Sequence, residues 1–229
     1  MDGDSFAPRV RLAQLELWLR TGAINQRKDA IDELAKCPSE IAVPVLQRLA
    51  ATEPDFVCRR FAIMGLGNHL TAESFQALVD LLGQEKDQNV LAEIANSLFE
   101  FGDPSVPVLQ QLFQRCTYWL TRQTILSILM EANHDAVLLE VVREALQDEA
   151  QTVRETAILA LGSALKGAVQ QEALALLTEL AQAEFWRDRW RAATALRLSA
   201  DPKAKQLLAQ LQRDENHYVV AAALEADLS

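Results

Sequence analysis

The sequence contains few glycine, proline and aromatic residues, and it lacks the alternating β-branched or aromatic runs that form strands. Among 229 residues there are 8 glycines and 7 prolines, and 6% of the residues are aromatic. Half of the residues are hydrophobic, and alanine and leucine are abundant. Because these two residues favour helices whereas strands favour β-branched and aromatic side chains, the composition predicts an all-α fold.

A surplus of basic residues is missing too, as are a long hydrophobic run and a secretory signal. The chain carries 22 Lys and Arg against 32 Asp and Glu, for a formal net charge of −10. Nucleic-acid backbones and anionic membrane surfaces attract basic proteins, so this balance argues against both as partners. No apolar run approaches the roughly 18–20 residues that span a bilayer, and the amino-terminal MDGDSFAPRVR has no apolar h-region. We therefore expect a cytoplasmic protein with no membrane insertion.

The cysteines are few and unevenly spaced. Cys37, Cys58 and Cys116 form no CxxC motif, which fits a reducing compartment better than a disulfide framework. Cys58 occupies a position that is apolar elsewhere in the chain, so we expect a small buried side chain. Cys37 and Cys116 lie at predicted helix ends. Each could be an inert thiol or could bind a bilin or an iron–sulfur unit transiently, and both alternatives stay open.

Motifs of known chemistry are missing. The histidines, His69, His134 and His217, have no acidic or cysteine neighbour at the helical spacing of metal ligands. There is no Gly-rich phosphate loop, nucleophile elbow or Ser/His/Asp arrangement. The sequence therefore predicts no metal, no cofactor and no catalytic residue, with histidines at surface or capping positions.

A helical hairpin is predicted for residues 148–182. Apolar residues recur there every four positions, as expected on one face of a helix, at Val153, Ala157, Leu161 and Leu165. Glycines at 162 and 167 loosen or end this helix, and a second apolar helix follows. One hairpin cannot bury its own hydrophobic faces, so neighbouring copies are required.

The same pattern recurs along the chain. Its starts fall at residues 26, 58, 90, 121, 153, 190 and about 220, a step close to 32 residues, which is typical of a solenoid. The longest step predicts an insertion around Ala183–Asp188 and places Trp190 at a core valine position. We expect a single domain over residues 1–229, a right-handed α-solenoid of about six helical hairpins running from about 24 to 229. An amino-terminal helix at 6–21 caps the array.

The hairpin helices carry a family resemblance. The pattern Asp…Val-Arg-x-x-Ala-x-x-x-Leu-Gly, present at Asp148 and residues 153–162, resembles HEAT-type repeats, in particular the phycobilisome lyase HEAT-like family. The resemblance implies that the Val-Arg helices line a concave face and that Asp and Arg residues form a ladder between repeats. Asp55 with Arg59 and Asp148 with Arg154 are similar to that ladder, which is incomplete in the middle of the chain.

The resemblance also implies a partner. Members of this family attach or remove bilin on phycobiliproteins, or assist phycobilisome breakdown, and the segment Trp119–Gln123 looks more like the breakdown members, the non-bleaching B type. Our main hypothesis is a non-catalytic scaffold that binds another protein. The first candidate for this partner is a phycobiliprotein. A bilin lyase and an accessory partner of an iron–sulfur scaffold protein stay open. A HEAT-fold DNA glycosylase is disfavoured, because its groove must be basic.

The expected binding surface consists of outward polar residues of the Val-Arg helices together with aromatic residues at the turns that precede them. Aromatic and arginine side chains are enriched in binding hot spots, although a solvated face is the plainer interpretation of the polar positions. The candidates are Arg60, Asn96, Glu100, Trp119, Gln123, Glu131, Glu155 and Trp186. If a bilin binds, its propionates require basic residues, for which Arg59 and Arg122 are available.

Overall fold

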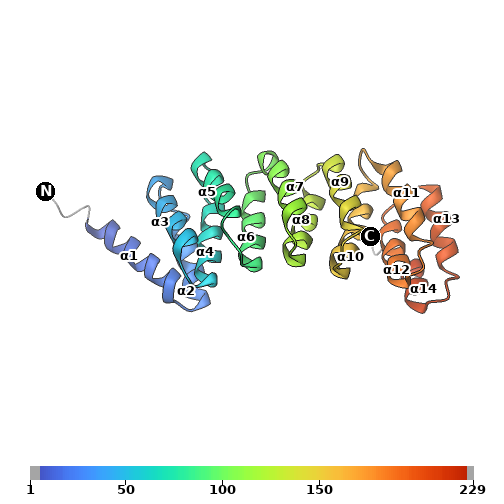
Figure 1. Cartoon of the computed structure of the whole chain (residues 1–229), viewed down its shortest axis with the longest axis horizontal. Helices are drawn as coiled ribbons and strands as arrows, with labels where there is room; N and C mark the ends of the chain where they lie inside the picture. The colour runs from blue at the N-terminus through green and yellow to red at the C-terminus, as the bar shows by residue number, and fades with distance from the viewer. Residues whose placement is uncertain (1–5, 226–229) are drawn as a thin grey trace. The chain divides into compact units, whose positions relative to one another are not determined.

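The computed structural model describes residues 6–225, and within this range the chain forms fourteen α-helices and one short 3-10 helix, with no strand (Figure 1). The side chains of residues 6–10 lie outside the described part. The all-α prediction is confirmed. No described helix is long and apolar enough to cross a membrane.

The chain divides into two compact units, Met1–Leu112 and Phe113–Ser229. Unit 1 contains α1 (Phe6–Thr21), α2 (Ile24–Leu34), α3 (Ser39–Thr52), α4 (Phe56–Gly67), α5 (Ala72–Leu82), α6 (Gln88–Phe99) and η1 (Asp103–Ser105). Helix α7 (Val106–Arg115) crosses the boundary. Unit 2 contains α8 (Trp119–Glu131), α9 (Asp135–Ala145), α10 (Gln151–Ala164), α11 (Gln170–Leu180), α12 (Trp186–Leu196), α13 (Pro202–Leu211) and α14 (His217–Leu224).

Each unit is a stack of helical hairpins in two layers. In unit 1 the helices α2, α4 and α6 pack against one another in turn, and α3 and α5 form the second layer behind them. Unit 2 repeats this arrangement, with α8, α10, α12 and α14 in the first layer and α9, α11 and α13 in the second (Figure 1). We call the first-layer helices the ladder helices and the others the backing helices. The predicted single domain over the whole chain stays a prediction.

The amino-terminal helix covers the first hairpin of unit 1. Helix α1 packs against α2 and α4, and it buries Leu15 and Leu19. This is the arrangement that a stacked array needs at its end.

Short polar side chains begin many of the helices. Asp55, Thr71, Asp87 and Asn216 each precede a helix and accept a hydrogen bond from a backbone N–H of its first turn. Such caps satisfy N–H groups that have no partner within the helix. The chain thus marks its helix starts locally, before any packing is considered.

The third residue of most ladder helices is a core position. Cys58, Val90, Thr121, Val153 and Val219 occupy it, and each of them is 0% exposed. In α12, which begins at Trp186, the third residue is Asp188 and Trp190 is the fifth. The prediction that Trp190 fills the core position is therefore wrong by two residues. Trp190-Arg191 imitates the apolar–Arg pair of the repeat, whereas the pair that occupies these positions is Asp188-Arg189.

The predicted insertion around Ala183–Asp188 is also wrong. The connection 181–185 has the same length as the connections 83–87, 146–150 and 212–216, which precede other ladder helices. The additional residues lie earlier, because α10 has 14 residues where α4 has 12.

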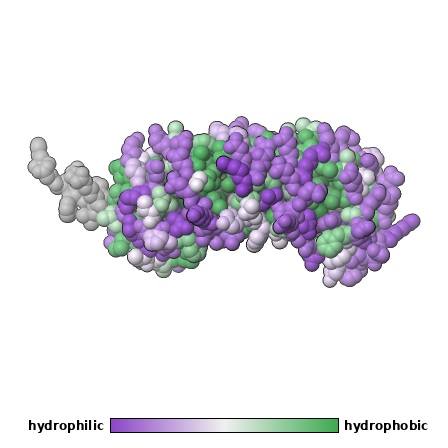
Figure 2. Space-filling model, viewed as in Figure 1, coloured by the Kyte–Doolittle hydropathy of each residue, from purple (hydrophilic) through white to green (hydrophobic). Residues whose placement is uncertain are grey.

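Hydrophilic residues cover most of the face shown in Figure 2, with hydrophobic residues visible between them.

Candidate partner-binding surface

The fourth residue of most ladder helices is an arginine that pairs with an acid of the next connection. In unit 1, Nη1 of Arg27 donates to Asp55 at 2.7 Å. Nε and Nη2 of Arg59 donate to both carboxylate oxygens of Glu85, at 2.8 and 3.1 Å. Paired hydrogen bonds of this kind hold arginine and carboxylate in a fixed geometry. These pairs join successive hairpins.

The ladder continues in unit 2. Nε of Arg122 lies 2.7 Å from Oδ2 of Asp148, and the guanidinium also lies over the Phe113 ring, 4.2 Å from its centroid. Arg189 donates to both oxygens of Asp214, at 2.7 and 3.0 Å. The arginine hydrogen bonds hold the pKa of Asp214 below its usual range, against the effect of burial.

The ladder pairs differ from those predicted. Asp55 binds Arg27 and Asp148 binds Arg122, so each acid reaches the arginine of the preceding ladder helix rather than the one that follows it. The following arginine instead donates to backbone carbonyls of the connection, as Arg154 does to Asp148 at 2.5 Å and Glu149 at 3.0 Å. Asp55 and Asp148 therefore each contact the preceding hairpin. The spacing of residues within one repeat does not reveal this contact.

Arg59 and Arg122, the predicted bilin-binding pair, both belong to the ladder. Their guanidinium groups are engaged with Glu85 and Asp148. Burial raises the pKa of Glu85, but the hydrogen bonds from Arg59, those from the backbone N–H groups of Asp87 and Lys86, and the Arg59 charge together outweigh it and lower that pKa overall. A role in binding an anionic ligand stays a prediction, and it would require these ion pairs to open.

Aromatic and arginine side chains gather on α12 and α14. The rings of Trp186 and Tyr218 stack with centroids 5.4 Å apart and an interplanar angle of 22°. Trp190 follows one turn along α12, its ring 6.1 Å from that of Trp186. Arg187 lies over Trp186 at 5.1 Å, and Arg191 lies over Trp190 at 3.9 Å. We call these five residues the aromatic–arginine surface.

Glu155 of α10 fixes the two arginines of this surface. Its carboxylate accepts from Nε and Nη2 of Arg191 at 2.9 and 2.7 Å, and from Arg187 at 3.2 Å. Gln151 donates a further hydrogen bond at 2.7 Å. Burial raises the pKa of Glu155, but these donors outweigh it and lower the pKa overall. Glu155 therefore lies beneath the arginines, with 12% of its side chain exposed, and holds them in place.

Two of the predicted surface residues are joined by contacts in the structure. Glu155 and Trp186 meet through Arg187, which pairs with the first and lies over the second. The structure adds Trp190, Tyr218 and Arg191. The signal in the sequence was the cluster of tryptophans and arginines at 186–191, whose register was misassigned by two residues.

The other predicted residues are spread over both units. Asn96 and Glu100 in unit 1 are exposed, as are Trp119 and Glu131 in unit 2, whereas Gln123 is half-buried. Arg60 pairs with the buried Glu93 at 2.9 Å. Their roles in partner binding stay predictions.

Two of the cysteines are buried. Burial raises the pKa of Cys58 to about 11, so its thiol stays protonated at neutral pH. Its expected role as a small buried side chain is confirmed by an exposure of 0%. Cys116 is also buried and Cys37 is half-buried.

Among residues 6–225 no group of three or more His, Cys, Asp or Glu side chains is placed to hold a metal ion.

Stacked helical hairpins joined by an arginine–acid ladder define the protein as an α-helical repeat solenoid. A family model of HEAT repeats matches residues 50–130 and 139–228, and the chain therefore belongs to the HEAT repeat family. No curated protein sequence matches the chain.

Solved structures share this fold at low sequence identity. The karyopherin Kap121p bound to the extreme C-terminus of the protein phosphatase Cdc14p is similar with a TM-score of 0.54 at 16% identity, over 94% of this chain and 29% of that chain. The complex of CpcE and CpcF of phycocyanin lyase from Nostoc sp. PCC7120 is similar with a TM-score of 0.50 at 18% identity, over 97% and 87%. The chain spans less than a third of the karyopherin.

Proposed function

We propose that the protein is a non-catalytic binding module that holds another protein on the ladder helices of unit 2. The observation that carries this proposal is the aromatic–arginine surface, in which Trp186, Trp190 and Tyr218 reach solvent beside two arginines. Tryptophan, tyrosine and arginine are the residues most enriched in binding hot spots.

The surface is held rigid before any partner arrives. Arg187 and Arg191 are fixed at one end by Glu155 and along their length by the indole rings. Side chains that are already ordered lose little conformational entropy on binding, which leaves more of the contact energy for affinity. The large rings then supply apolar area at low entropic cost.

The charge of the surface points to the chemistry of the partner segment. Two arginines share the single carboxylate of Glu155, so the cluster carries a local positive excess on a chain with a formal net charge of −10. A partner segment with acidic residues beside an aromatic or aliphatic side chain would match it. Charge complementarity of this kind favours the correct partner and a fast encounter.

A phycobiliprotein is the finer proposal for this partner. It is supported by the resemblance of the repeat helices to the phycobilisome lyase HEAT-like family, whereas the similarity to the phycocyanin lyase structure concerns the fold alone. A bilin lyase is less well supported, because the arginines expected to hold bilin propionates are bound in the ladder.

Affinity capture with matched variants tests the proposal. The wild-type chain and Trp190→Ala are immobilised and exposed to extract of the native cell, and captured proteins are quantified by mass spectrometry. We expect a partner whose capture falls at least about tenfold in Trp190→Ala and is retained by the control Phe56→Ala, which truncates an exposed aromatic residue of unit 1. Equal capture by the wild type and by Trp190→Ala would refute the role of the aromatic–arginine surface in partner binding. Titration with purified phycocyanin, followed by its visible absorption, then tests the finer proposal.

A further inference from the structure

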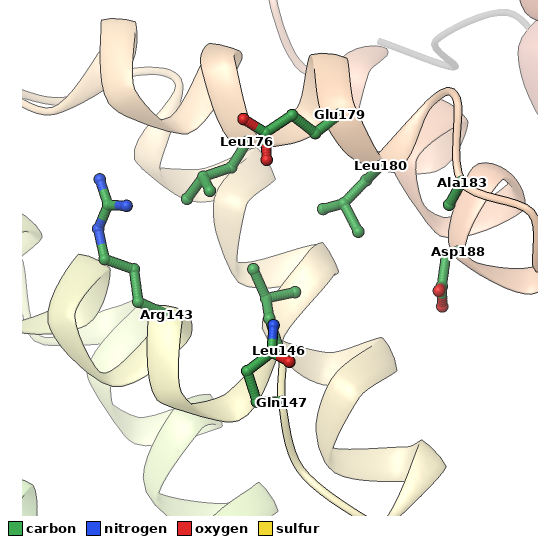
Figure 3. A pocket seen from close by; sticks show the side chains of 8 residues that line it. All are labelled: Arg143, Leu146, Gln147, Leu176, Glu179, Leu180, Ala183 and Asp188. Atoms are coloured by element: carbon green, nitrogen blue, oxygen red, sulfur yellow. The ribbon is translucent and has the colours of Figure 1, made fainter.

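A pocket of about 440 Å³ opens in unit 2 between the ends of α9 and α11 and the start of α12. Its walls are formed by Arg143, Leu146, Gln147, Leu176, Glu179, Leu180, Ala183 and Asp188 (Figure 3). Unit 1 has a pocket at the corresponding place, between the ends of α3 and α5, but its volume is about 250 Å³. Pockets that bind small ligands measure about 300–1,000 Å³, and of these two corresponding pockets the one in unit 2 falls in that range.

The larger pocket lies where one ladder acid is missing. Ala183 stands three residues before α12 begins, and the corresponding positions before α6, α10 and α14 hold acids that bind a ladder arginine. Those acids are Glu85, Asp148 and Asp214. An alanine cannot make this pair, and among the described residues no carboxylate forms an ion pair with Arg154. The smaller pocket of unit 1, in contrast, contains Arg59 and Glu85, which bind each other.

A carboxylate stands at the edge of this pocket in a position that is otherwise apolar or neutral. Asp188 is the third residue of α12, where the other ladder helices of unit 2 have fully buried Thr121, Val153 and Val219. Burial raises its pKa, an effect that the nearby Arg154 opposes and Glu155 reinforces. A carboxylate whose pKa is raised and which stands at the edge of a pocket is typical of a functional site.

Two helix ends add to the negative character of the pocket. Helices α9 and α11 end at Ala145 and Leu180, and residues of their last turns line the wall. The carboxyl end of a helix carries a partial negative charge, and α11 has no basic residue in its last turn. Glu179 contributes a second carboxylate.

Two cations oppose this charge without occupying the same place. Arg154 lies beyond the lining residues, with Nη1 bound to the carbonyls of Asp148 and Glu149. Arg143 is exposed, and in the view of Figure 3 it lies at the opposite end of the pocket from Asp188. The leucines lie between these two ends, so the Asp188 end is the place for a cation.

We propose that this pocket binds a primary ammonium group carried on an aliphatic stem. The ammonium would pair with Asp188, and the stem would lie along the wall formed by Leu146, Leu176 and Leu180. Long basic side chains bury apolar stems in this way. The group could come from a lysine side chain of a protein or from a free alkylamine. This site goes beyond the aromatic–arginine surface and does not depend on it.

NMR titration of the full chain tests the proposal, with the amide signals of Ala183 and Asp188 as the readout. One arm uses n-pentylamine, a second uses Nα-acetyl-lysine amide, and pentan-1-ol serves as the neutral comparison. We expect saturable shifts with at least one amine and none with the alcohol. Binding of the lysine derivative alone assigns the site to protein lysines, and binding of pentylamine alone assigns it to free amines. The absence of binding by both amines would overturn the proposal.

Three variants separate recognition from structural damage. Asp188→Asn keeps the shape of the side chain and removes its charge, and we expect amine affinity to fall about tenfold. Ala183→Glu supplies the missing ladder acid, which should pair with Arg154, narrow the pocket and abolish binding. Glu184→Gln changes an exposed carboxylate of the same connection that does not line the pocket, and it should bind like the wild type. Equal affinity in Asp188→Asn and the wild type would refute the site.

Discussion

The two units are built from the same helical repeat but differ in their pockets and in the side chains on their ladder helices. In unit 1 the pocket between backing helices is lined by Arg59 and Glu85, which bind each other, whereas the corresponding pocket of unit 2 is larger and has Ala183 in place of the acid. The ladder helices of unit 1 present Arg60 paired with Glu93, and those of unit 2 present tryptophans with arginines. The comparison teaches that regular positions stabilise the stack and that departures from the repeat mark the candidate sites.

Removing the arginine of a complete ladder pair should have the largest effect on stability. Arg59→Gln leaves Glu85 nearly buried without its cationic partner, and we expect the free energy of unfolding to fall by about 2–3 kcal/mol. Arg154→Gln is the matched variant in unit 2, where no carboxylate of the described residues forms an ion pair with the arginine, and it should cost less than about 1 kcal/mol. Urea unfolding measures both. Equal losses would show that the ladder pair is not what distinguishes the two units.

The hub of the aromatic–arginine surface should show the next largest effect. Glu155→Gln removes the charge that Arg187 and Arg191 share, and we expect a loss of about 1–2 kcal/mol in unfolding free energy. Freed arginines should also leave the indole rings, which changes tryptophan fluorescence in the folded state. An unchanged spectrum with unchanged stability would contradict the role of Glu155 as a hub.

Asp188 should be the reverse case, a residue whose replacement stabilises the protein. Asp188→Val restores the repeat residue at a core position, and we expect the free energy of unfolding at neutral pH to rise by about 1 kcal/mol. The pKa of Asp188 is higher in the folded state than in the unfolded state. Ionised Asp188 therefore lowers the free energy of unfolding at pH values above its folded-state pKa, and this loss disappears at pH values below its unfolded-state pKa. The gain should therefore shrink as the pH falls. Denaturant midpoints across the acid range measure it, and a gain that grew on acidification would refute the assignment.

Trp119→Ala should have the smallest effect. The side chain is 46% exposed at the start of α8, so little apolar area is lost from the core. We expect a loss of less than about 0.5 kcal/mol. Thermal unfolding checks this, and a larger loss would place Trp119 among the residues that stabilise the stack of unit 2.

Much of the fold could be predicted because it depends on local spacing. The hairpin predicted for 148–182 is observed as α10 and α11, with Leu174 and Leu177 buried. The register of α12 was missed because two apolar–Arg look-alikes lie two residues apart, and only packing shows which one faces the core. Trp190 consequently moved from the predicted core to the solvent-facing cluster.

The candidate site was predictable only in part. Trp186 and Glu155 were identified from their positions in the repeat, but not the contacts that join them through Arg187. The ladder pairs were misassigned for the same reason, since each joins side chains 25–28 residues apart, as Arg189 and Asp214 show. Such contacts depend on how one hairpin stacks on the next.

The sequence by itself determined that this protein is an all-α array of similar hairpins, because a period near 32 residues and helical spacing of apolar residues leave few other ways to bury the chain. The tertiary structure decided which charged groups meet: among the described residues it left Arg154 without a ladder acid, and it placed Asp188 beside a pocket. Those outcomes follow from the stacking of one hairpin on another, which brings together residues that no local pattern connects.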